Sequence, residues 1–239
     1  MEETYTTKAI VLNRQPFREN DLRVAVFSMD YGRLELVARG AKKLKSKQAG
    51  HIEPITLAKL MIVRGKQFDY IGSALGENFY AGIKSDLEKI CFVGKAVALV
   101  KRLVKENLKS EDVFWLLEEF LSVMNQELGI RNKKFFYYFF ILKLLSSLGY
   151  EPELKNCLKC KKKIEPGNNY FNFKSGGLEC GRCSDKNKDS IKISDDCIKV
   201  LRLGIGSDFT TLQKLKIDKR LEKEVISAID GFYRYNFGG

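Results

Sequence analysis

The sequence contains a single histidine among its 239 residues. One histidine leaves no pair for a histidine-based metal site, and it argues against catalysis in which histidines act as general acid and base. There are only four prolines, and hydrophobic residues make up 44% of the chain, which is the composition of a globular and not of a disordered protein. We therefore expect a globular protein in which histidine chemistry has little part.

Long apolar runs are also lacking. The longest, residues 135–145, is interrupted by Lys143 and falls short of the ~18 residues that a membrane-spanning helix needs. The first residues show no basic segment followed by an apolar stretch, so no secretion signal and no membrane partner are expected. We expect a cytoplasmic protein, in which the six cysteines serve as metal ligands or buried thiols and not as disulfides.

Positive charge is what the sequence has in excess. Its 42 Lys and Arg residues outnumber its 30 Asp and Glu residues, which gives a net charge of +12 and favours a polyanionic partner. The length predicts about two compact units of ~100–150 residues. Because the residue pattern changes from β to helical near residue 80, we expect one domain at residues 1–80 and a second at 81–239.

Residues 4–80 contain short segments rich in β-branched and aromatic residues, separated by turn-forming residues. The predicted strands are 6–12, 22–28, 33–38, 57–63 and 68–73. Five strands in so short a region, with no long helical pattern, are typical of a small barrel such as the OB-fold. A small β-sandwich fits the same pattern nearly as well.

From residue 83 onward the apolar residues recur with a helical period. Amphipathic helices are predicted at 94–108, after the N-cap serines Ser110 and Ser194, and from Asp218 onward. The aromatic-rich helix at 132–148 is interpreted as the centre of a bundle, with a pocket for a partner as the alternative. The C-terminal domain is thus predicted to be an α-helical bundle with a zinc module inserted at about residues 151–190.

Four cysteines in that insertion form two CxxC pairs, Cys157 with Cys160 and Cys180 with Cys183, and nineteen residues separate the pairs. Four thiolates at this spacing can close a tetrahedral shell around one zinc ion. A hairpin at residues 170–179 would bring the pairs together, as in a zinc ribbon. Such a zinc ion has no open coordination position and is therefore structural. A reducible pair of dithiols is the main alternative.

The remaining cysteines, Cys91 and Cys197, have apolar helical surroundings in the sequence. Free cysteine is among the most buried residue types and behaves as a small hydrophobic side chain. Both are therefore interpreted as buried residues without a chemical role.

An enzyme interpretation rests on His51 and Glu53, which together with a later CxxC imitate the zinc-deaminase signature. That signature requires a proline before the cysteine pair, and none precedes Cys157 or Cys180. Residues 204–206 read Gly-Ile-Gly, but no strand precedes them as a dinucleotide-binding loop requires, and no Walker A sequence is present. We therefore expect no catalytic residues and no enzymatic activity.

The loop expected at residues 39–51 carries five basic residues and no acidic one. Its glycines let the backbone approach a phosphate, and its cations supply the counterion release that dominates non-specific nucleic-acid affinity. Phe17 and Tyr31 are candidates for base stacking. A basic face with no ligand is the alternative. The predicted DNA-binding residues are Arg14, Arg18, Arg23, Arg39, Lys42, Lys43, Lys45 and Lys47.

The sequence resembles the RecO family of bacterial recombination-repair proteins. The matching elements, in the family's order, are residues 7–12, the Asn20-Asp21 turn leading into 22–24, residues 32–34, 38–43 followed by Ser46, 148–152 and 176–178. They extend from near the N-terminus to Cys183, or roughly three quarters of the chain, and it is their order that carries the resemblance. The last fifty residues match only as helices.

The resemblance implies an N-terminal OB-fold and a helical C-terminal domain with a zinc module. It also implies a non-enzymatic mediator of DNA repair and recombination that binds single- and double-stranded DNA and anneals complementary strands. The implied partners are RecR, the C-terminal tail of the single-stranded-DNA-binding protein SSB and, indirectly, RecA, in the cytoplasm at the nucleoid.

Two other classes remain open. One is an RNA-binding or ribosome-associated protein with an OB-fold and a zinc site. The other is a scaffold that binds no nucleic acid and whose charge serves solubility or an acidic protein partner.

Overall fold

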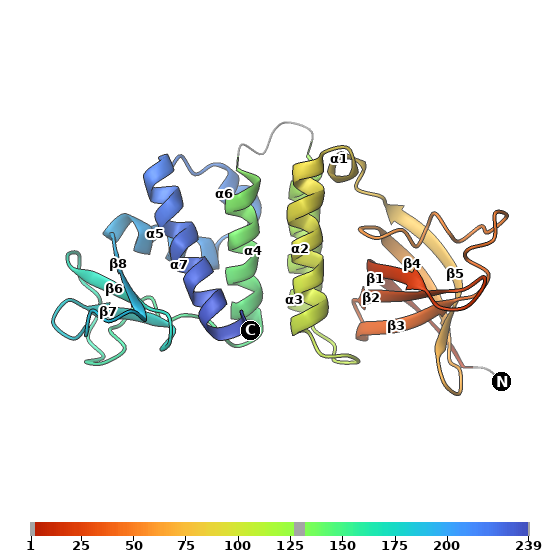
Figure 1. Cartoon of the computed structure of the whole chain (residues 1–239), viewed down its shortest axis with the longest axis horizontal. Helices are drawn as coiled ribbons and strands as arrows, with labels where there is room; N and C mark the ends of the chain where they lie inside the picture. The colour runs from red at the N-terminus through yellow and green to blue at the C-terminus, as the bar shows by residue number, and fades with distance from the viewer. Residues whose placement is uncertain (1–2, 127–131, 239) are drawn as a thin grey trace. The chain divides into compact units, whose positions relative to one another are not determined.

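The computed structural model describes residues 3–126 and 132–238, and the chain divides into two compact units, residues 1–129 and 130–239. The first unit, red to yellow-green in Figure 1, contains strands β1 to β5 and helices α1 to α3. The second, green to blue, contains helices α4 to α7 and strands β6 to β8. The predicted order, strands first and helices after, is confirmed. Three of those helices belong to the compact unit of the strands.

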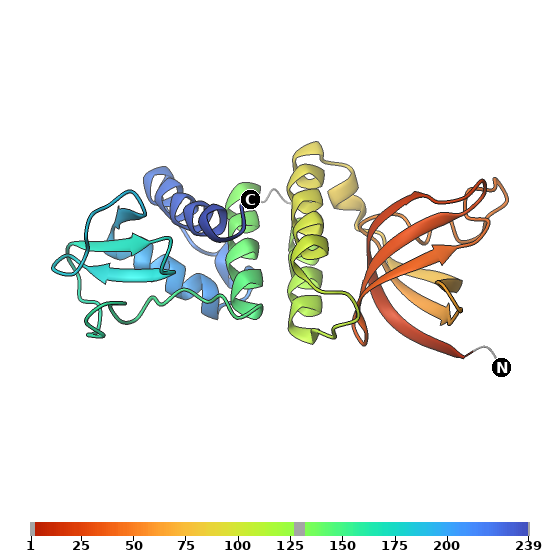
Figure 2. The ribbon, with the colours of Figure 1, turned by 60° about the horizontal axis from the view of Figure 1, so that its bottom comes forward.

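Five strands of the first unit form one closed barrel (Figure 2). Their order is β1-β2-β3-β5-β4, in which β3 and β5 pair in parallel and all other neighbours are antiparallel. Because a sandwich requires two sheets, the sandwich alternative is wrong. The strands are β1 (Thr4–Pro16), β2 (Leu22–Ser28), β3 (Gly32–Ala38), β4 (Leu57–Val63) and β5 (Asp69–Asn78).

The barrel interior is filled by alternate residues of each strand. On β4, Ala58, Leu60 and Ile62 are buried, whereas Lys59 and Met61 between them are exposed. Strands β2 and β3 supply the same kind of β-branched and aliphatic side chains. Burial of these side chains is the main stabilising contribution to the first unit.

Strand β1 is longer than the predicted 6–12 because it pairs on both sides. Residues 4–10 pair with β4 and residues 9–16 pair with β2. A register shift between Val11 and Asn13 bends the strand between its two partners. The polar ends of β1 carry little apolar pattern, which is why the sequence predicted only its centre.

Helices α1 (Ala81–Lys84), α2 (Leu87–Leu103) and α3 (Glu111–Met124) complete the first unit. The helix predicted at residues 94–108 corresponds to α2, which begins and ends earlier in the chain than predicted. Asp86 sets the start of α2, because its carboxylate accepts hydrogen bonds from two backbone N–H groups of the first turn, and the backbone becomes extended at Val104. Ser110 precedes α3 as predicted, but its side chain makes no capping hydrogen bond.

The second unit is built on α4 (Lys133–Ser147), with a small sheet in the order β7-β6-β8. The predicted cap at Ser194 is confirmed, because its side chain accepts a hydrogen bond from the N–H of Cys197. The last helix begins near Asp218 as predicted, and the Asp218 side chain caps it by accepting from the N–H of Leu221. The remaining elements are β6 (Asn169–Asn172), β7 (Gly177–Cys180), β8 (Ser190–Ile193), α5 (Asp195–Gly206), α6 (Phe209–Gln213) and α7 (Lys219–Phe237).

Helix α4 is the core of this unit, as predicted. Eight of its residues are buried, and the ring of Phe136 packs 6.1 Å from that of Phe209 in α6. Phe139 lies against Gly204 of α5, where an added Cβ would come within 1.7 Å of the ring. The first glycine of the Gly-Ile-Gly sequence is thus required for helix packing, not for binding a nucleotide.

Within the described ranges, no helix has the length and hydrophobicity that crossing a membrane requires.

Candidate metal centre and nucleic-acid interface

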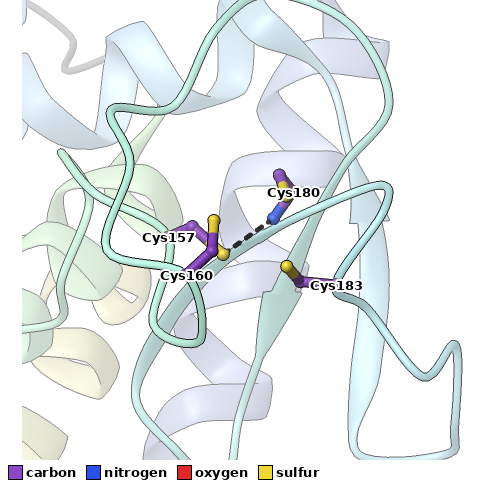
Figure 3. A group of neighbouring side chains, drawn as sticks. All are labelled: Cys157, Cys160, Cys180 and Cys183. Carbon is purple, nitrogen blue, oxygen red and sulfur yellow. Dashed lines mark hydrogen bonds between the residues drawn. The ribbon is translucent and has the colours of Figure 1, made fainter.

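The structure brings the two CxxC pairs together through the β6–β7 hairpin. Gly176, with a φ of +65°, turns the chain between these strands, and Cys180 ends β7. The segment before Cys157 lies beside β7, since the N–H of Leu178 donates to the carbonyl of Glu153 at 2.9 Å. In Figure 3 the four side chains gather at one point, and their sulfur atoms lie within 4.8 Å of one another.

Glycine is required where the first cysteine loop lies against β7. A Cβ on Gly177 would meet the Glu153 carbonyl oxygen at 2.6 Å. The Glu153 carboxylate in turn accepts from the backbone N–H groups of Lys155 and Asn156, and these hydrogen bonds lower the pKa of that carboxyl. Glu153 therefore shapes the loop that positions Cys157, a role that the sequence did not reveal.

Two of the thiols, those of Cys157 and Cys183, differ in their readiness to ionise. Burial of Cys157 opposes ionisation, but hydrogen bonds from the backbone N–H groups of Cys160, Cys180 and Lys159 outweigh it and lower the pKa of Cys157 to about 6. The Cys180 N–H lies 3.4 Å from the Cys157 sulfur (dashed line in Figure 3). Hydrogen bonds with the sulfurs of Cys180 and Cys160, together with burial, raise the pKa of Cys183 to about 12.

This donor set fits one zinc ion. Zinc–sulfur bonds of ~2.3 Å in a tetrahedron place the sulfurs about 3.8 Å apart, so a small contraction of the 4.8 Å cluster suffices. Four soft thiolates suit zinc and leave no open coordination position. Lys159, which lies between Cys157 and Cys160 in the sequence, is paired with Asp185 and lies 3.9 Å from the buried Glu179.

The two other cysteines differ from each other. Cys197 is buried as predicted, and burial strongly raises the pKa of its thiol. The prediction for Cys91 is wrong, because that residue is exposed. It lies on the side of α2 away from the buried Val93, Val97 and Val100.

The basic loop, residues 39–51, is a chain of turns tied to the barrel at both ends. At its start the N–H of Gly40, a residue with φ +64°, donates to the Asp21 carboxylate at 2.8 Å. At its end His51 accepts a hydrogen bond from the N–H of Gly76 at 3.0 Å, and Gln48 donates to the carbonyl of Gly72. The lone histidine therefore holds the loop against β5.

The loop presents its lysines to solvent. Lys42, Lys43, Lys45 and Lys47 are all exposed, and Leu44 at the tip is fully exposed. Arg14 has a different position. Its guanidinium pairs with Glu53 at 2.5 Å and donates to the carbonyl of Ala49, so it fastens the end of the loop.

An arginine–aromatic cluster lies beside the basic loop. The Arg23 guanidinium lies over the rings of Phe17 and Phe68, at 4.7 and 5.5 Å, and Arg18 lies over the Phe17 ring at 5.1 Å. The cluster contains residues of the β1–β2 turn, of β2, of the start of β5 and the turn before it, and the first residue of the basic loop. Its members are Phe17, Arg18, Arg23, Arg39, Phe68 and Tyr70.

The cluster also contains a stack of Arg39 on Tyr70, in which the guanidinium lies closer to the ring than that of Arg23 does to Phe17. The Arg39 guanidinium lies 3.6 Å from the centre of the Tyr70 ring. Phe68 and Tyr70 were not predicted as site residues, although both lie in the predicted strand 68–73. Tyr31 lies at the other end of the β2–β3 hairpin, where its ring packs on Tyr5 at 4.5 Å, so it is outside the cluster.

The comparison with protein families covers nearly the whole chain. The model described as Recombination protein O N terminal matches residues 1–79, and that described as Recombination protein O C terminal matches residues 84–239.

Individual relatives show the same coverage. A "DNA repair protein RecO" from Thermoanaerobacter sp. strain X514 is 30% identical over 228 residues, which is 95% of this chain and 90% of the relative. One of the same name from Desulforamulus reducens is 30% identical over 234 residues, 97% of this chain and 89% of the relative. A third, from Roseiflexus sp. strain RS-1, is 30% identical over 98% of this chain and 81% of its own length.

Proposed function

The chain belongs to the RecO family, and from this premise we propose that it is a non-enzymatic mediator of DNA repair and recombination. It binds single- and double-stranded DNA without sequence preference and anneals complementary strands. Together with RecR it helps load RecA onto single-stranded DNA coated with SSB, whose acidic C-terminal tail is a further partner. It acts in the cytoplasm at the nucleoid.

The observation that carries this proposal is the arginine–aromatic cluster beside the basic loop. The stacked guanidinium groups keep their charge for a phosphate. The rings of the cluster are half-buried, so part of each remains open to an unpaired base. The loop lysines add contacts to phosphates that do not depend on sequence. Stacking together with backbone charge is the combination used by proteins that bind single strands non-specifically.

We assign the barrel to the OB-fold class and residues 1–80 to a DNA-binding domain. OB-folds bind oligonucleotides on strands 2 and 3 and on the loops between strands 1–2 and 4–5. The cluster occupies these positions, with Arg23 on β2, Phe17 in the β1–β2 turn and Phe68 in the β4–β5 turn. The DNA-binding residues proposed here are those predicted from the sequence except Arg14, whose pairing with Glu53 gives it the role of fastening the loop, and Phe68 and Tyr70 are added.

Residues 81–239 form the second domain of this proposal, with one structural zinc ion in the module at about 151–190. Cys157, Cys160, Cys180 and Cys183 would hold the ion. When bound, zinc cross-links the loop before β6 to the end of β7 and performs no reaction. The protein's own part is to hold the four sulfurs close together through the β6–β7 hairpin.

Annealing follows from charge neutralisation. Two complementary strands repel each other through their phosphates, and cations bound along one strand lower that repulsion. The stacked arginines and the exposed lysines supply these cations without fixing the base sequence. Nothing in this scheme requires a reacting group.

The proposal is tested by measuring the annealing of complementary strands coated with SSB, with and without RecR. We expect the protein to speed annealing. We expect RecR to increase the loading of RecA that the protein assists. A competition between RNA and DNA of equal length separates this function from RNA binding, because preference for RNA would contradict it. Absence of DNA binding at moderate salt would favour the scaffold instead.

A further inference from the structure

The second unit has a basic hollow of its own, and three of the four cysteines of the metal centre, Cys157, Cys160 and Cys180, form part of its wall. Its volume is about 550 Å³, and four cationic side chains line it, those of Lys162, Lys163, Arg182 and Lys186. All four residues are exposed. A volume of this size lies in the range of roughly 300–1,000 Å³ that accommodates a small ligand or one unit of a longer one.

These four cationic side chains are not neutralised by acidic partners within the described part of the protein. In the part of the chain that the structure describes, none of the four side chains has an ion pair or a hydrogen bond. Lys159, in the same module, shows the contrast, because it is paired with Asp185. Like charges brought together around a hollow repel one another, and an anionic ligand removes that repulsion.

The other charges at the hollow do not cancel this excess. One carboxylate residue, Glu165, also lines it. A zinc ion held by four thiolates adds about two negative charges. Residues 157–190 contain eight basic and four acidic side chains, so the module stays positive with the zinc centre counted. The ring of Tyr170 in the wall of the hollow adds a surface for a base.

We propose that this hollow binds the phosphate backbone of a second nucleic-acid strand. One molecule would then hold two strands, one on the barrel and one on the zinc module, and their encounter would become intramolecular. This inference rests on the proposed function and deepens it, since it names the surface that receives the partner strand during annealing.

The test compares two double substitutions that remove equal charge from the same module. Lys162→Ala with Arg182→Ala removes two of the four cationic side chains that line the hollow. Lys174→Ala with Lys188→Ala is the matched control, because both lysines are exposed and neither lines the hollow. Native mass spectrometry with two non-complementary oligonucleotides of about 15 nucleotides, each of distinct mass, counts the strands on each molecule.

We expect one wild-type or control molecule to bind both oligonucleotides, and the hollow variant to bind one. Annealing by the hollow variant should fall by about tenfold, because two separate molecules must then meet, while its affinity for one strand changes little. Zinc content, measured by atomic emission on each protein, shows whether the cysteine centre is intact. If the first variant loses zinc, Lys163→Ala with Lys186→Ala takes its place.

The inference would be overturned by a hollow variant that still binds two strands, or by two-strand complexes that contain two protein molecules. A wild-type protein that binds one strand only would also overturn it and leave the proposed function standing. A wild-type protein that binds no DNA would contradict the proposed function itself.

Discussion

Single residues decide how closely the elements of this protein approach. Gly204 lets α5 pack on the ring of Phe139, and Gly177 lets the first cysteine loop lie against β7. His51, alone of its kind, accepts a backbone hydrogen bond that fastens the basic loop. At these positions the residue type is set by a contact with a distant part of the chain.

Gly204→Ala should destabilise the second unit by about 1–3 kcal/mol, because its Cβ would overlap the Phe139 ring in a packed core. Gly206→Ala in the same helix is the control, since nothing lies within 4 Å of its Cβ position. Chemical denaturation monitored by circular dichroism gives both values. Equal stabilities for the two variants would contradict the packing of α4 on α5.

Cys157 should make the metal-free protein sensitive to pH. Because its folded pKa of about 6 lies below the ordinary 9, the ionised form stabilises the folded state above pH 9, and that contribution is lost as the pH falls through 6. The melting temperature after chelation should therefore fall between pH 8 and pH 5, and Cys157→Ser should show a smaller fall. Cys183 acts oppositely: its raised pKa gives stability that is lost as the pH rises from 9 towards 12.

Among the structural elements, the basic loop and the arginine–aromatic cluster form one surface. The loop starts where β3 ends at Ala38, and the cluster gathers residues from the β1–β2 turn, β2 and β5 around that point. Because the loop is tied to Asp21 at one end and to β5 at the other, its lysines are held on a fixed frame.

Lys42→Ala with Lys43→Ala should weaken DNA binding for every sequence and lower the salt dependence of the affinity by about two phosphate contacts. Lys95→Ala with Lys105→Ala removes the same charge from exposed positions outside the loop and should leave that dependence unchanged. Binding titrations over a range of salt concentrations provide the measurement. An unchanged slope for the loop variant would remove the loop from the mechanism.

As a whole molecule the protein is two compact units, each with its own core and its own basic surface. The barrel core is aliphatic, whereas the core of the second unit is built on the phenylalanines of α4. Four of the cysteines, which a metal can cross-link, lie in the second unit only.

Removing zinc should therefore lower the stability of the second unit and leave the barrel unaffected. Calorimetry should show two transitions, of which a chelator moves one to lower temperature. The salt-dependent binding of a single DNA strand by the barrel should persist. A chelator that abolished all DNA binding would show that the metal also supports the barrel.

The amino-acid pattern was sufficient to predict the five barrel strands, the β6–β7 hairpin, most of the helices, the cap at Ser194 and the four-cysteine cluster, because these depend on periodicity and spacing within short stretches of chain. It did not predict β8. It misplaced α2 and misjudged Cys91, because burial depends on what packs against a helix face.

The tertiary structure alone decided which charged side chains are available to bind a polyanion. Barrel closure brings Phe68 and Tyr70 to Arg23 and Arg39 from distant strands, and the fold pairs Arg14 with Glu53 and Lys159 with Asp185. The sequence determined how many charges this protein carries. Only the fold determined which of them are neutralised by a neighbour and which remain open to a polyanion, because ion pairing depends on distances of a few ångströms between residues far apart in the chain.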